Sequence, residues 1–221
     1  MKSIIFDMDG TVIDTLKDMT ISMNHVLAAH GMAERSGDEI RSFVGNGIRK
    51  LVERAVPPQT AEELTEHCYQ DMLSYYQQHS LDNTAPYEGI VELMEGLKAR
   101  GYKMAIVTNK AQAAAELISR KFFGDLVDAV VGDDKKSPLK PDPYNINRIM
   151  NDFGCAPGEA VYVGDSEVDK LTADNTGIPF FAVSWGFRGR SFLEEQGAQN
   201  ISETAAELER QLEEYFKALQ V

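Results

Sequence analysis

The fold of this chain is decided by the stretch Ile4-Ile5-Phe6-Asp7-Met8-Asp9-Gly10-Thr11. Its apolar run is short, β-prone and ended by an acid, which predicts a buried strand of a parallel sheet. Ligands of such sheets bind outside the carboxyl ends of the strands, and side chains alternate along an extended chain. We therefore expect Asp7 and Asp9 to leave that edge on the same side, where a divalent cation or one raised pKa would relieve their repulsion. Taken alone, the stretch is equally typical of a core strand followed by an Asp-rich turn.

Length, charge and cysteine content narrow the possible classes of protein. The chain has 221 residues, 43% of them hydrophobic, which is enough for one large domain or two small ones. Its 22 Lys and Arg and 35 Asp and Glu give a formal net charge of −13, which argues against nucleic acid or an anionic membrane as partner. No apolar segment approaches the ~18 residues of a membrane span, and no signal peptide is recognisable. Cys68 and Cys155 lack metal-ligand spacing, which favours reduced thiols in a cytoplasmic protein. Separately, we expect the protein to be a monomer or a weak homodimer.

The chain beyond the first strand shows two patterns of hydrophobic residues. Residues 14–86 contain no convincing strand, and helices are expected at 16–30, 38–55 and 61–78. From Tyr87 onward, helices alternate with short apolar strands, which indicates βαβ units and a parallel sheet. The strands are expected at 103–108, 129–131, 160–163 and 180–183, with a final amphipathic helix at 203–219. We therefore expect a Rossmann-like α/β core formed by residues 1–14 and 87–221, with residues 15–86 inserted as an all-helical cap domain that acts as a lid.

Polar residues follow the predicted strands, and parallel strands bring these ends to one edge of the sheet. Thr108 ends the second strand, Lys140 lies in the loop after the third, and Asp165 follows the fourth. These residue types suit phosphoryl transfer, in which a carboxylate attacks phosphorus, a second acid moves protons and positive charge meets the phosphoryl oxygens. Lys140 would give one positive charge and Mg²⁺ two, with Asp7 and Asp165 as oxygen ligands. The Thr108 hydroxyl and the amides after it, beginning with Asn109, would hold phosphate at the start of a helix.

Each of these residues also has a purely structural interpretation. Thr108 or Asn109 can cap a helix, a single lysine such as Lys140 is most often exposed to solvent, and Asp165 can form a turn. However, Pro141 disfavours a helical conformation at the residue before it, which keeps Lys140 on a loop at the sheet edge. The shared position of these residues at strand ends favours one common site.

Four motifs in this order resemble those of the haloacid dehalogenase superfamily. They are Asp7-x-Asp9-Gly10-Thr11, Thr108 at a strand end, Lys140-Pro141 and Gly164-Asp165-Ser166-x-x-Asp169. The helical insert between the first two motifs resembles the C1-type cap of that superfamily. Asp9 matches the acid/base position of the phosphatase branch, so dehalogenation is not expected. Within the superfamily, residues 43–48, 107–110 and 183–187 look most like phosphoglycolate phosphatases.

The resemblance implies roles for the three acids of the first and fourth motifs. Asp7 would be the nucleophile and a Mg²⁺ ligand. Asp9 would be the general acid/base, and its backbone carbonyl would be a further Mg²⁺ ligand. Asp165 would complete the protein ligands of the metal.

The resemblance also implies which residues bind the phosphoryl group and which hold those residues in place. Thr108, Asn109 and Lys140 would contact the phosphoryl oxygens. Asp169, together with Ser166, would orient Lys140 or a metal-bound water.

The implied activity is that of a Mg²⁺-dependent phosphatase acting on a small phosphorylated metabolite, with 2-phosphoglycolate as the preferred substrate. In the cap, Asn46 and Gly47 would face the substrate and Arg49 would pair with a substrate carboxylate, although a solvent-facing arginine is the simpler interpretation. A β-phosphoglucomutase-like mutase ranks lower, because residues 18–21 lack the histidine that is usual in that branch. Pyrophosphatase or nucleotide phosphatase activity, and a receiver-like module that accepts phosphate without turnover, are further alternatives.

Overall fold

The computed structural model describes residues 2–219, which divide into two compact units. The core unit comprises the chain up to Ile13 together with the chain from Pro86 onward, and the helical unit comprises Asp14–Ala85. The segments that connect the units pair as a two-stranded sheet of β2 (Ile13–Asp14) and β3 (Ala85–Pro86). No helix within residues 2–219 is both long and apolar enough to cross a membrane.

The core unit is built on a six-stranded parallel sheet in the order β5-β4-β1-β6-β7-β8. Strand β1 lies between β4 and β6, so the chain winds in opposite directions on its two sides, and ligands of such sheets bind at this switch point. The predicted α/β fold with a parallel sheet is confirmed. The strands are β1 (Ser3–Phe6), β4 (Lys103–Ala111), β5 (Ala129–Asp133), β6 (Ala160–Gly164), β7 (Phe180–Val183) and β8 (Asn200–Ser202).

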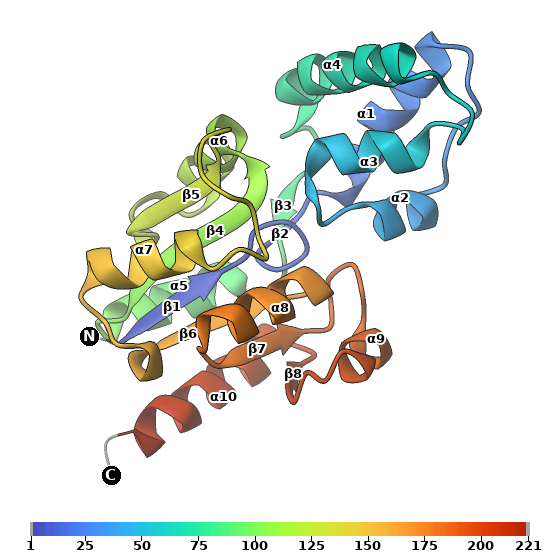
Figure 1. The fold of residues 1–221 in the computed structure, drawn as a ribbon. Coiled ribbons are helices and arrows are strands. Elements are labelled where there is room, and N and C mark those ends of the chain that lie inside the picture. Colours follow the sequence, from blue (N-terminus) through green and yellow to red (C-terminus); the bar gives the residue numbers. More distant parts are fainter. Residues whose placement is uncertain (1, 220–221) are drawn as a thin grey trace. The chain divides into compact units, whose positions relative to one another are not determined.

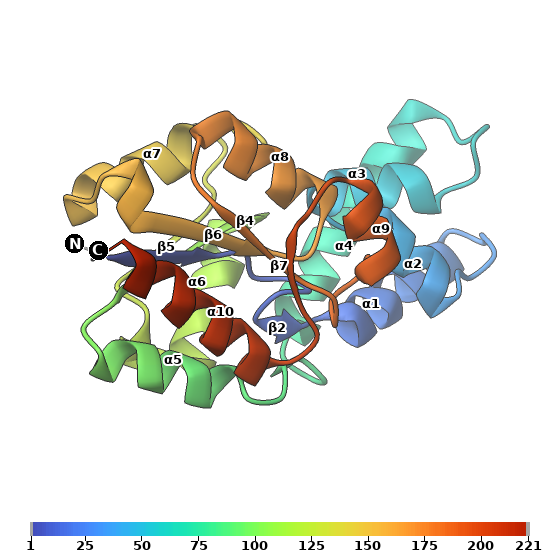
Figure 2. The ribbon, with the colours of Figure 1, turned by 90° about the horizontal axis from the view of Figure 1, so that it is seen from below.

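Helices cover both faces of this sheet, as Figure 2 shows, with α7 and α8 on one face and α5 and α10 on the other. Helix α6 follows β4 directly and packs against β4 and β5. The helices of the core unit are α5 (Ile90–Ala99), α6 (Gln112–Phe122), α7 (Tyr144–Phe153), α8 (Glu167–Thr176), α9 (Arg190–Glu195) and α10 (Ala205–Ala218), with short 3-10 turns η1 (Gly124–Leu126) and η2 (Pro157–Glu159).

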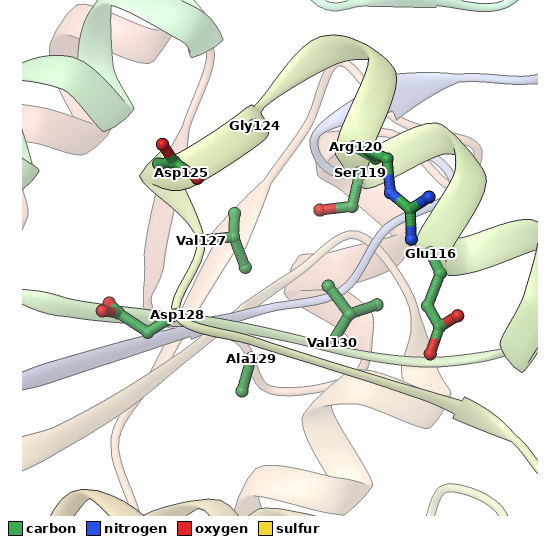
Figure 3. Close-up of a pocket in the computed structure, with 9 residues that line it drawn as sticks. All are labelled: Glu116, Ser119, Arg120, Gly124, Asp125, Val127, Asp128, Ala129 and Val130. Carbon is green, nitrogen blue, oxygen red and sulfur yellow. The ribbon is translucent and has the colours of Figure 1, made fainter.

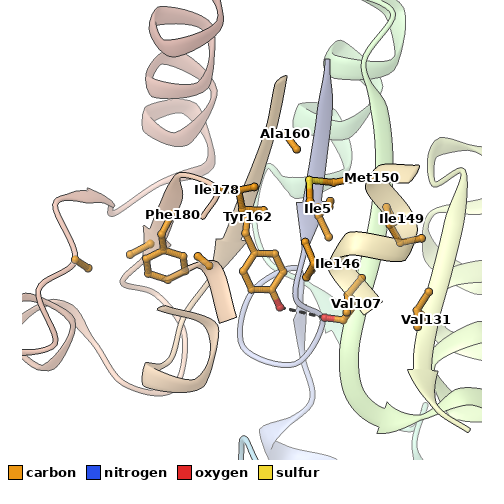
Figure 4. Close-up of a cluster of buried hydrophobic side chains, with 14 of the residues drawn as sticks. Ile5, Val107, Val131, Ile146, Ile149, Met150, Ala160, Tyr162, Ile178 and Phe180 are labelled. Atoms are coloured by element: carbon orange, nitrogen blue, oxygen red, sulfur yellow. Dashed lines mark hydrogen bonds between the residues drawn. The ribbon is translucent and has the colours of Figure 1, made fainter. Parts of the chain in front are cut away.

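Apolar side chains between the sheet and helix α7 form a continuous core (Figure 4). Ile5 of β1 and Val107 of β4 are almost fully buried there, against Ile146 and Ile149 of α7. Strands covered on both faces have no solvent side, which explains why the strand residues are apolar without alternation. The same core contains Tyr162 of β6, whose hydroxyl is the polar group that connects it to the carboxyl edge of the sheet.

The helical unit contains four helices, drawn in blue to green in Figure 1. They are α1 (Leu16–Ala29), α2 (Gly37–Phe43), α3 (Gly47–Ala55) and α4 (Glu62–His79). Within the unit, the buried carboxylate of Asp18 on α1 accepts hydrogen bonds from the backbone and side chains of Asn83 and Thr84, at 2.7–3.0 Å. This contact fixes the end of the unit to its first helix.

The prediction of one helix at 38–55 is wrong, because α2 and α3 are separate helices. Val44 is extended, with φ −72° and ψ 167°, and Gly45 has φ 112°. A positive φ of this kind is open to glycine at little cost and ends the helix. Arg54 then donates hydrogen bonds to the Phe43 carbonyl and to Oδ1 of Asn46, each at 2.7 Å, which holds the break in place.

Other differences concern the ends of elements and the shortest elements of the core unit. Strand β4 extends to Ala111 instead of ending at 108, and the final helix covers Ala205–Ala218 because Thr204 caps it by accepting a bond from the Glu207 amide at 3.2 Å. Helix α9 and strand β8 were not predicted. They have six and three residues, which is too short for hydrophobic periodicity to identify.

Candidate active site

The carboxyl ends of β1 and β6 bring two of the predicted site acids together. The strands pair in parallel with Phe6 opposite Val163, and the Asp7 amide continues the ladder by donating to the Val163 carbonyl at 2.8 Å. Asp7 therefore lies beside the turn that carries Asp165. Carboxylate oxygens of Asp7, Asp165 and Asp169 all lie within 4.8 Å of one another, and all three residues are buried. This proximity is the condition that a shared cation requires.

Lys140 reaches into this group of acids from the loop after β5. Its side chain is 4% exposed, and its ammonium nitrogen lies 2.7 Å from Oδ1 of Asp7, 2.7 Å from Oδ1 of Asp169 and 2.9 Å from the Tyr162 hydroxyl. The ammonium donates hydrogen bonds to Asp169 and Tyr162, and its contact with Asp7 is an ion pair. The lysine holds the positive charge of the site at a defined point between two carboxylates.

Tyr162 is a member of this site that the sequence analysis did not identify. Its ring belongs to the apolar core, and its hydroxyl lies 3.2 Å from the Val107 carbonyl (Figure 4). The same hydroxyl lies 3.1 Å from Oδ1 of Asp169. The hydroxyl accepts from Lys140 and donates its one proton to either oxygen. Its position within an apolar strand looks like core packing, and no feature of the sequence distinguishes it.

Burial and mutual repulsion shift the pKa values of the acids. The pKa of Asp7 is raised to about 7, chiefly by burial and next by the nearby charge of Asp169, while Lys140 opposes both effects. Burial also raises the pKa of Asp165 well above its ordinary value, again with a contribution from the charges of Asp169 and Asp7. Burial lowers the pKa of Lys140, but the two carboxylates beside it outweigh burial and the net direction is upward. The site thus carries more negative charge than its lysine neutralises.

Asp165 is positioned by two segments distant in the sequence. One carboxylate oxygen accepts from the Thr11 hydroxyl at 3.2 Å and the other from the Phe187 amide at 2.7 Å. Gly10 makes this approach possible, because it has φ 88° and a Cβ at this residue would lie 2.4 Å from Oδ2 of Asp165. Each carboxylate oxygen retains a lone pair, so both can still bind a cation.

Asp169 is saturated by protein donors. Besides Lys140 and Tyr162 on Oδ1, its Oδ2 accepts from the Ser166 hydroxyl at 2.6 Å and from the amides of Ser166 and Asp165 at 3.1 and 3.2 Å. Ser166 in turn caps helix α8 by accepting from the Asp169 amide, which completes a capping box. These contacts suit a residue that holds Lys140 and the Asp165 turn.

Asp9 leaves the same edge of the sheet but pairs with a lysine that the sequence analysis gave no role. The Lys110 ammonium lies 2.9 and 3.2 Å from the two carboxylate oxygens of Asp9. The acid group of Asp9 is therefore held on the β4 side, opposite the side on which β6 carries Asp165.

Thr108 and Asn109 do not stand at the start of a helix, so this part of the prediction is wrong, and phosphate binding by the two residues stays a prediction. Both lie within β4, and α6 begins only at Gln112. The Thr108 hydroxyl accepts a hydrogen bond from the Lys110 amide at 3.2 Å, two residues further along the same strand. Asn109 pairs with the backbone of Lys140 in both directions, donating to its carbonyl at 3.2 Å and accepting from its amide at 2.8 Å. Asn109 thereby positions the loop that carries Lys140.

The candidate residues of the helical unit have partners within that unit. Arg49 pairs with Glu66 at 2.8 Å and its guanidinium lies 4.0 Å from the centre of the Tyr69 ring. Oδ1 of Asn46 accepts from Arg54. Gly47 is the first residue of α3 and has φ 82°.

A hollow of about 390 Å³ lies elsewhere in the core unit, between α6, η1 and β5 (Figure 3). It includes Ala129 and Val130, which begin β5, so it lies at the amino end of that strand rather than at the carboxyl edge. Its charged residues are of both signs, and Asp128 is already paired with Lys98 and Lys103. This hollow is therefore separate from the acidic site, the name used here for the buried cluster of Asp7, Asp165 and Asp169.

The residues of the acidic site fit a magnesium ion. Mg²⁺ prefers hard oxygen ligands and keeps several waters, so it is usually held by one or two carboxylates. Asp7 and Asp165 offer such oxygens in a buried cluster whose negative charge exceeds that of its lysine. A divalent cation would relieve the same repulsion that raises their pKa values.

Comparison with known proteins supports the family predicted from the motifs. Residues 4–183 match the model of a family described as haloacid dehalogenase-like hydrolase. A phosphoglycolate phosphatase of Mesorhizobium japonicum is 35% identical over 205 residues, which cover 90% of this chain and 89% of the relative. A phosphoglycolate phosphatase of Rhodobacter capsulatus is 36% identical over 191 residues, with coverages of 84% and 85%.

A solved structure agrees with this result. The crystal structure of a protein from Lactobacillus delbrueckii subsp. bulgaricus has a TM-score of 0.90 and 30% identity, covering 95% of this chain and 98% of that protein. The predicted superfamily is thus confirmed at the level of sequence and of fold. The chain belongs to the haloacid dehalogenase-like hydrolase family.

Proposed function

We propose that this protein is a Mg²⁺-dependent phosphatase that hydrolyses a small phosphate monoester, 2-phosphoglycolate in the first instance. The observation that carries the proposal is the buried cluster in which Asp7 lies 2.7 Å from Lys140 and within 4.8 Å of Asp165. A nucleophilic carboxylate, a fixed positive charge and a cation site are the parts that phosphoryl transfer needs. The names of the relatives in Mesorhizobium japonicum and Rhodobacter capsulatus support the choice of substrate.

The reaction is assigned to two acids of the core unit. A carboxylate oxygen of Asp7 attacks phosphorus, forming an aspartyl-phosphate while the bond between phosphorus and the ester oxygen breaks. Asp9 protonates that oxygen as the alcohol leaves, and then takes a proton from the water that attacks phosphorus. The second attack releases inorganic phosphate and restores Asp7.

The remaining site residues are assigned to charge and position. Mg²⁺, held by Asp7, Asp165 and the Asp9 backbone carbonyl, would supply positive charge to the phosphoryl oxygens. Lys140, Thr108 and Asn109 are the proposed phosphoryl-binding residues. To bind the phosphoryl group, Lys140 must exchange one of its three present contacts for a phosphoryl oxygen, and its contacts with Asp169 and Tyr162 keep it in place during that exchange.

The helical unit is proposed to select the substrate, with Asn46, Gly47 and Arg49 as candidate contacts. Arg49 is suited to this by its guanidinium, which can bind a carboxylate with two parallel hydrogen bonds. Its present pairing with Glu66 is on the surface of the unit, with the two side chains 49% and 43% exposed, so it is easily exchanged.

The test is a measurement of inorganic phosphate released from a panel of phosphate esters in the presence of Mg²⁺. The panel contains 2-phosphoglycolate, pyrophosphate, a nucleoside monophosphate and β-glucose 1-phosphate. We expect the highest kcat/KM for 2-phosphoglycolate, no release by Asp7→Asn, and full activity in the matched control Asp125→Asn, whose exposed acid lies on η1. Substantial turnover by Asp7→Asn would overturn the nucleophile assignment, and conversion of the sugar phosphate without phosphate release would indicate a mutase.

A further inference from the structure

Lys110, which is ion-paired with Asp9, is the buried charge of the site that the proposed reaction does not use. The side chain of Lys110 is only 2% exposed, and that of Asp9 is 16% exposed. A lysine is rarely buried to this degree unless its charge has a partner. Lysines usually lie on the surface, whereas Lys110 is buried at the carboxyl edge of the sheet, beside Asp9. This position suggests that its positive charge has a function at the site.

The backbone that carries Lys110 is held firmly. Its amide donates to the Thr108 hydroxyl at 3.2 Å, and β4 continues past it to Ala111. Immediately after, the Gln112 side chain bridges to β5, donating to the Val130 carbonyl at 3.1 Å and accepting from the Gly132 amide at 2.5 Å. This amide group replaces the missing backbone ladder where the register of β4 and β5 shifts between Val107 and Ala111. The lysine is therefore presented by a rigid strand end.

The contact with Asp9 places the Lys110 ammonium on the leaving-group side of the substrate. Asp9, as the proposed proton donor, must contact the ester oxygen that leaves. Because Lys110 contacts Asp9, its nitrogen lies within two hydrogen-bond lengths, roughly 6 Å, of that oxygen. Lys140, by contrast, is paired with Asp7 and serves the phosphoryl side. The two buried lysines thus face the two ends of the bond that breaks.

The charge of the site shows why a cation is needed on that side. Asp7, Asp165 and Asp169 form a buried cluster of carboxylates, Asp9 leaves the same edge of the sheet, and Lys140 is already shared between Asp7 and Asp169. A second anionic group on the leaving alcohol would be repelled by these acids unless a positive charge met it. A carboxylate on the carbon next to the ester oxygen lies roughly 3 Å from that oxygen, which is within reach of Lys110.

We infer that Lys110 binds the carboxylate of the leaving group. It thereby selects phosphate esters of 2-hydroxy acids over phosphate esters of uncharged alcohols. The inference rests on the proposed phosphatase function and deepens it. It assigns substrate choice in part to the core unit, through a residue that touches both the acid/base group and the substrate.

The test compares 2-phosphoglycolate with its amide, 2-phosphoglycolamide, which has the same shape but no carboxylate charge. We expect Lys110→Met to lower the ratio of the two kcat/KM values roughly 10- to 100-fold, the effect of removing one charge-assisted hydrogen bond. Any effect of the variant on Asp9 acts on both substrates and cancels in the ratio. Lys110→Arg should retain most of the wild-type ratio, and the exposed control Lys136→Met should leave it unchanged.

A second readout does not depend on turnover. Calorimetric titration with 3-phosphonopropionate, which cannot be hydrolysed, should show weaker binding to Lys110→Met, whereas propylphosphonate should bind both proteins alike. If Lys110→Met does not fold, as judged by circular dichroism, Lys110→Gln takes its place. An unchanged ratio would overturn the inference and leave Lys110 as a positioning residue for Asp9. A wild-type enzyme that releases no phosphate from either ester would instead overturn the proposed function.

Discussion

The ammonium nitrogen of Lys140 lies 2.7 Å from Oδ1 of Asp7, although 132 residues lie between them in the chain. The pair exists because β1 ends at Asp7 while the Lys140 loop is fixed by Asn109 on the neighbouring strand. This pair holds the proposed nucleophile next to the positive charge that its reaction would need.

The acid/base role proposed for Asp9 predicts a separation of the two half-reactions. Asp9→Asn should lower steady-state phosphate release from 2-phosphoglycolate roughly 10²- to 10⁴-fold, the usual contribution of general acid–base catalysis. With p-nitrophenyl phosphate, whose leaving group needs no proton, the first half-reaction should survive. Stopped-flow absorbance should then show a burst of p-nitrophenol equal to the enzyme concentration, followed by slow turnover. Unimpaired turnover of both esters would refute the assignment.

Removal of the metal predicts coupled losses of activity and stability. A chelator should stop phosphate release, and Mg²⁺ should restore it. A ligand that binds only the folded protein stabilises it by about 2.7 kcal/mol at 100 times its Kd, so Mg²⁺ should raise the Tm measured by calorimetry. In Asp165→Asn both effects should disappear. Activity that persists in the chelated enzyme would contradict the metal site.

Tyr162→Phe tests whether the buried hydroxyl positions Lys140. The variant removes the oxygen that accepts from Lys140 and leaves one ammonium proton without its partner. We expect a loss of about 1–3 kcal/mol in the free energy of unfolding. We also expect kcat to fall, because Lys140 is less well held. Tyr215→Phe is the matched control, since it removes a hydroxyl that donates to the Gly158 carbonyl at 3.0 Å, outside the site. Equal kcat values in the two variants would exclude the positioning role.

Asp18 predicts a pH-dependent contribution to stability. Burial raises the pKa of Asp18, but hydrogen bonds from Asn83 and Thr84 lower it by more, so its net direction is downward. A carboxyl whose pKa is lower in the folded state stabilises the fold above its unfolded pKa of about 3.9, and this contribution is lost as the pH falls through the folded value. Asp18→Asn should therefore lower the free energy of unfolding by about 2–3 kcal/mol at pH 7.

The same difference between wild type and Asp18→Asn should shrink as the pH approaches the acid limit of folding. Urea unfolding followed by circular dichroism at several pH values measures it. Glu34→Gln, at an exposed position of the same unit, is the control and should change stability by less than about 0.5 kcal/mol. A difference that is independent of pH would show that the ionised form of Asp18 is not the stabilising one.

Arg49→Ala tests substrate contact by the helical unit. The ion pair of Arg49 with Glu66 is half exposed, so its loss should cost at most about 1 kcal/mol of stability. If Arg49 binds substrate, KM for 2-phosphoglycolate should rise about tenfold with kcat little changed, the loss expected for one charged contact. Glu66→Gln breaks the same pair but keeps the guanidinium, so its KM should stay at the wild-type value. Parallel changes in both variants would assign Arg49 to the structure of the unit.

The order of strands and helices was largely predictable because each element leaves a local pattern. The buried strands are continuous apolar runs, and the four motifs lie near or after the carboxyl ends of strands of the confirmed parallel sheet. Prediction failed where the pattern is too short, as in α9 and β8, and where one glycine divides a helical pattern, as at Gly45.

Tyr162 and Lys110 show a different limit of the sequence. Tyr162 lies in an apolar strand and Lys110 directly follows Asn109 in β4, so neither position suggests the contact it makes. Their partners, Lys140 and Asp9, lie 22 and 101 residues away in the chain. Such contacts depend on the lateral order of the strands, on which the hydrophobic pattern carries no information.

Local patterns along the chain were sufficient to predict an α/β core with Asp7, Asp9, Lys140 and Asp165 at one sheet edge, and the resemblance of four motifs to a known superfamily supplied the hydrolase assignment. Propensity, periodicity and motif spacing act over a few residues, and the sequence displays them directly. The tertiary structure alone decided which acid faces which lysine: Asp7 with Lys140, and Asp9 with Lys110. The physical reason is that pairing of charges depends on distance in space, and that distance is set by strand order and register rather than by separation along the chain.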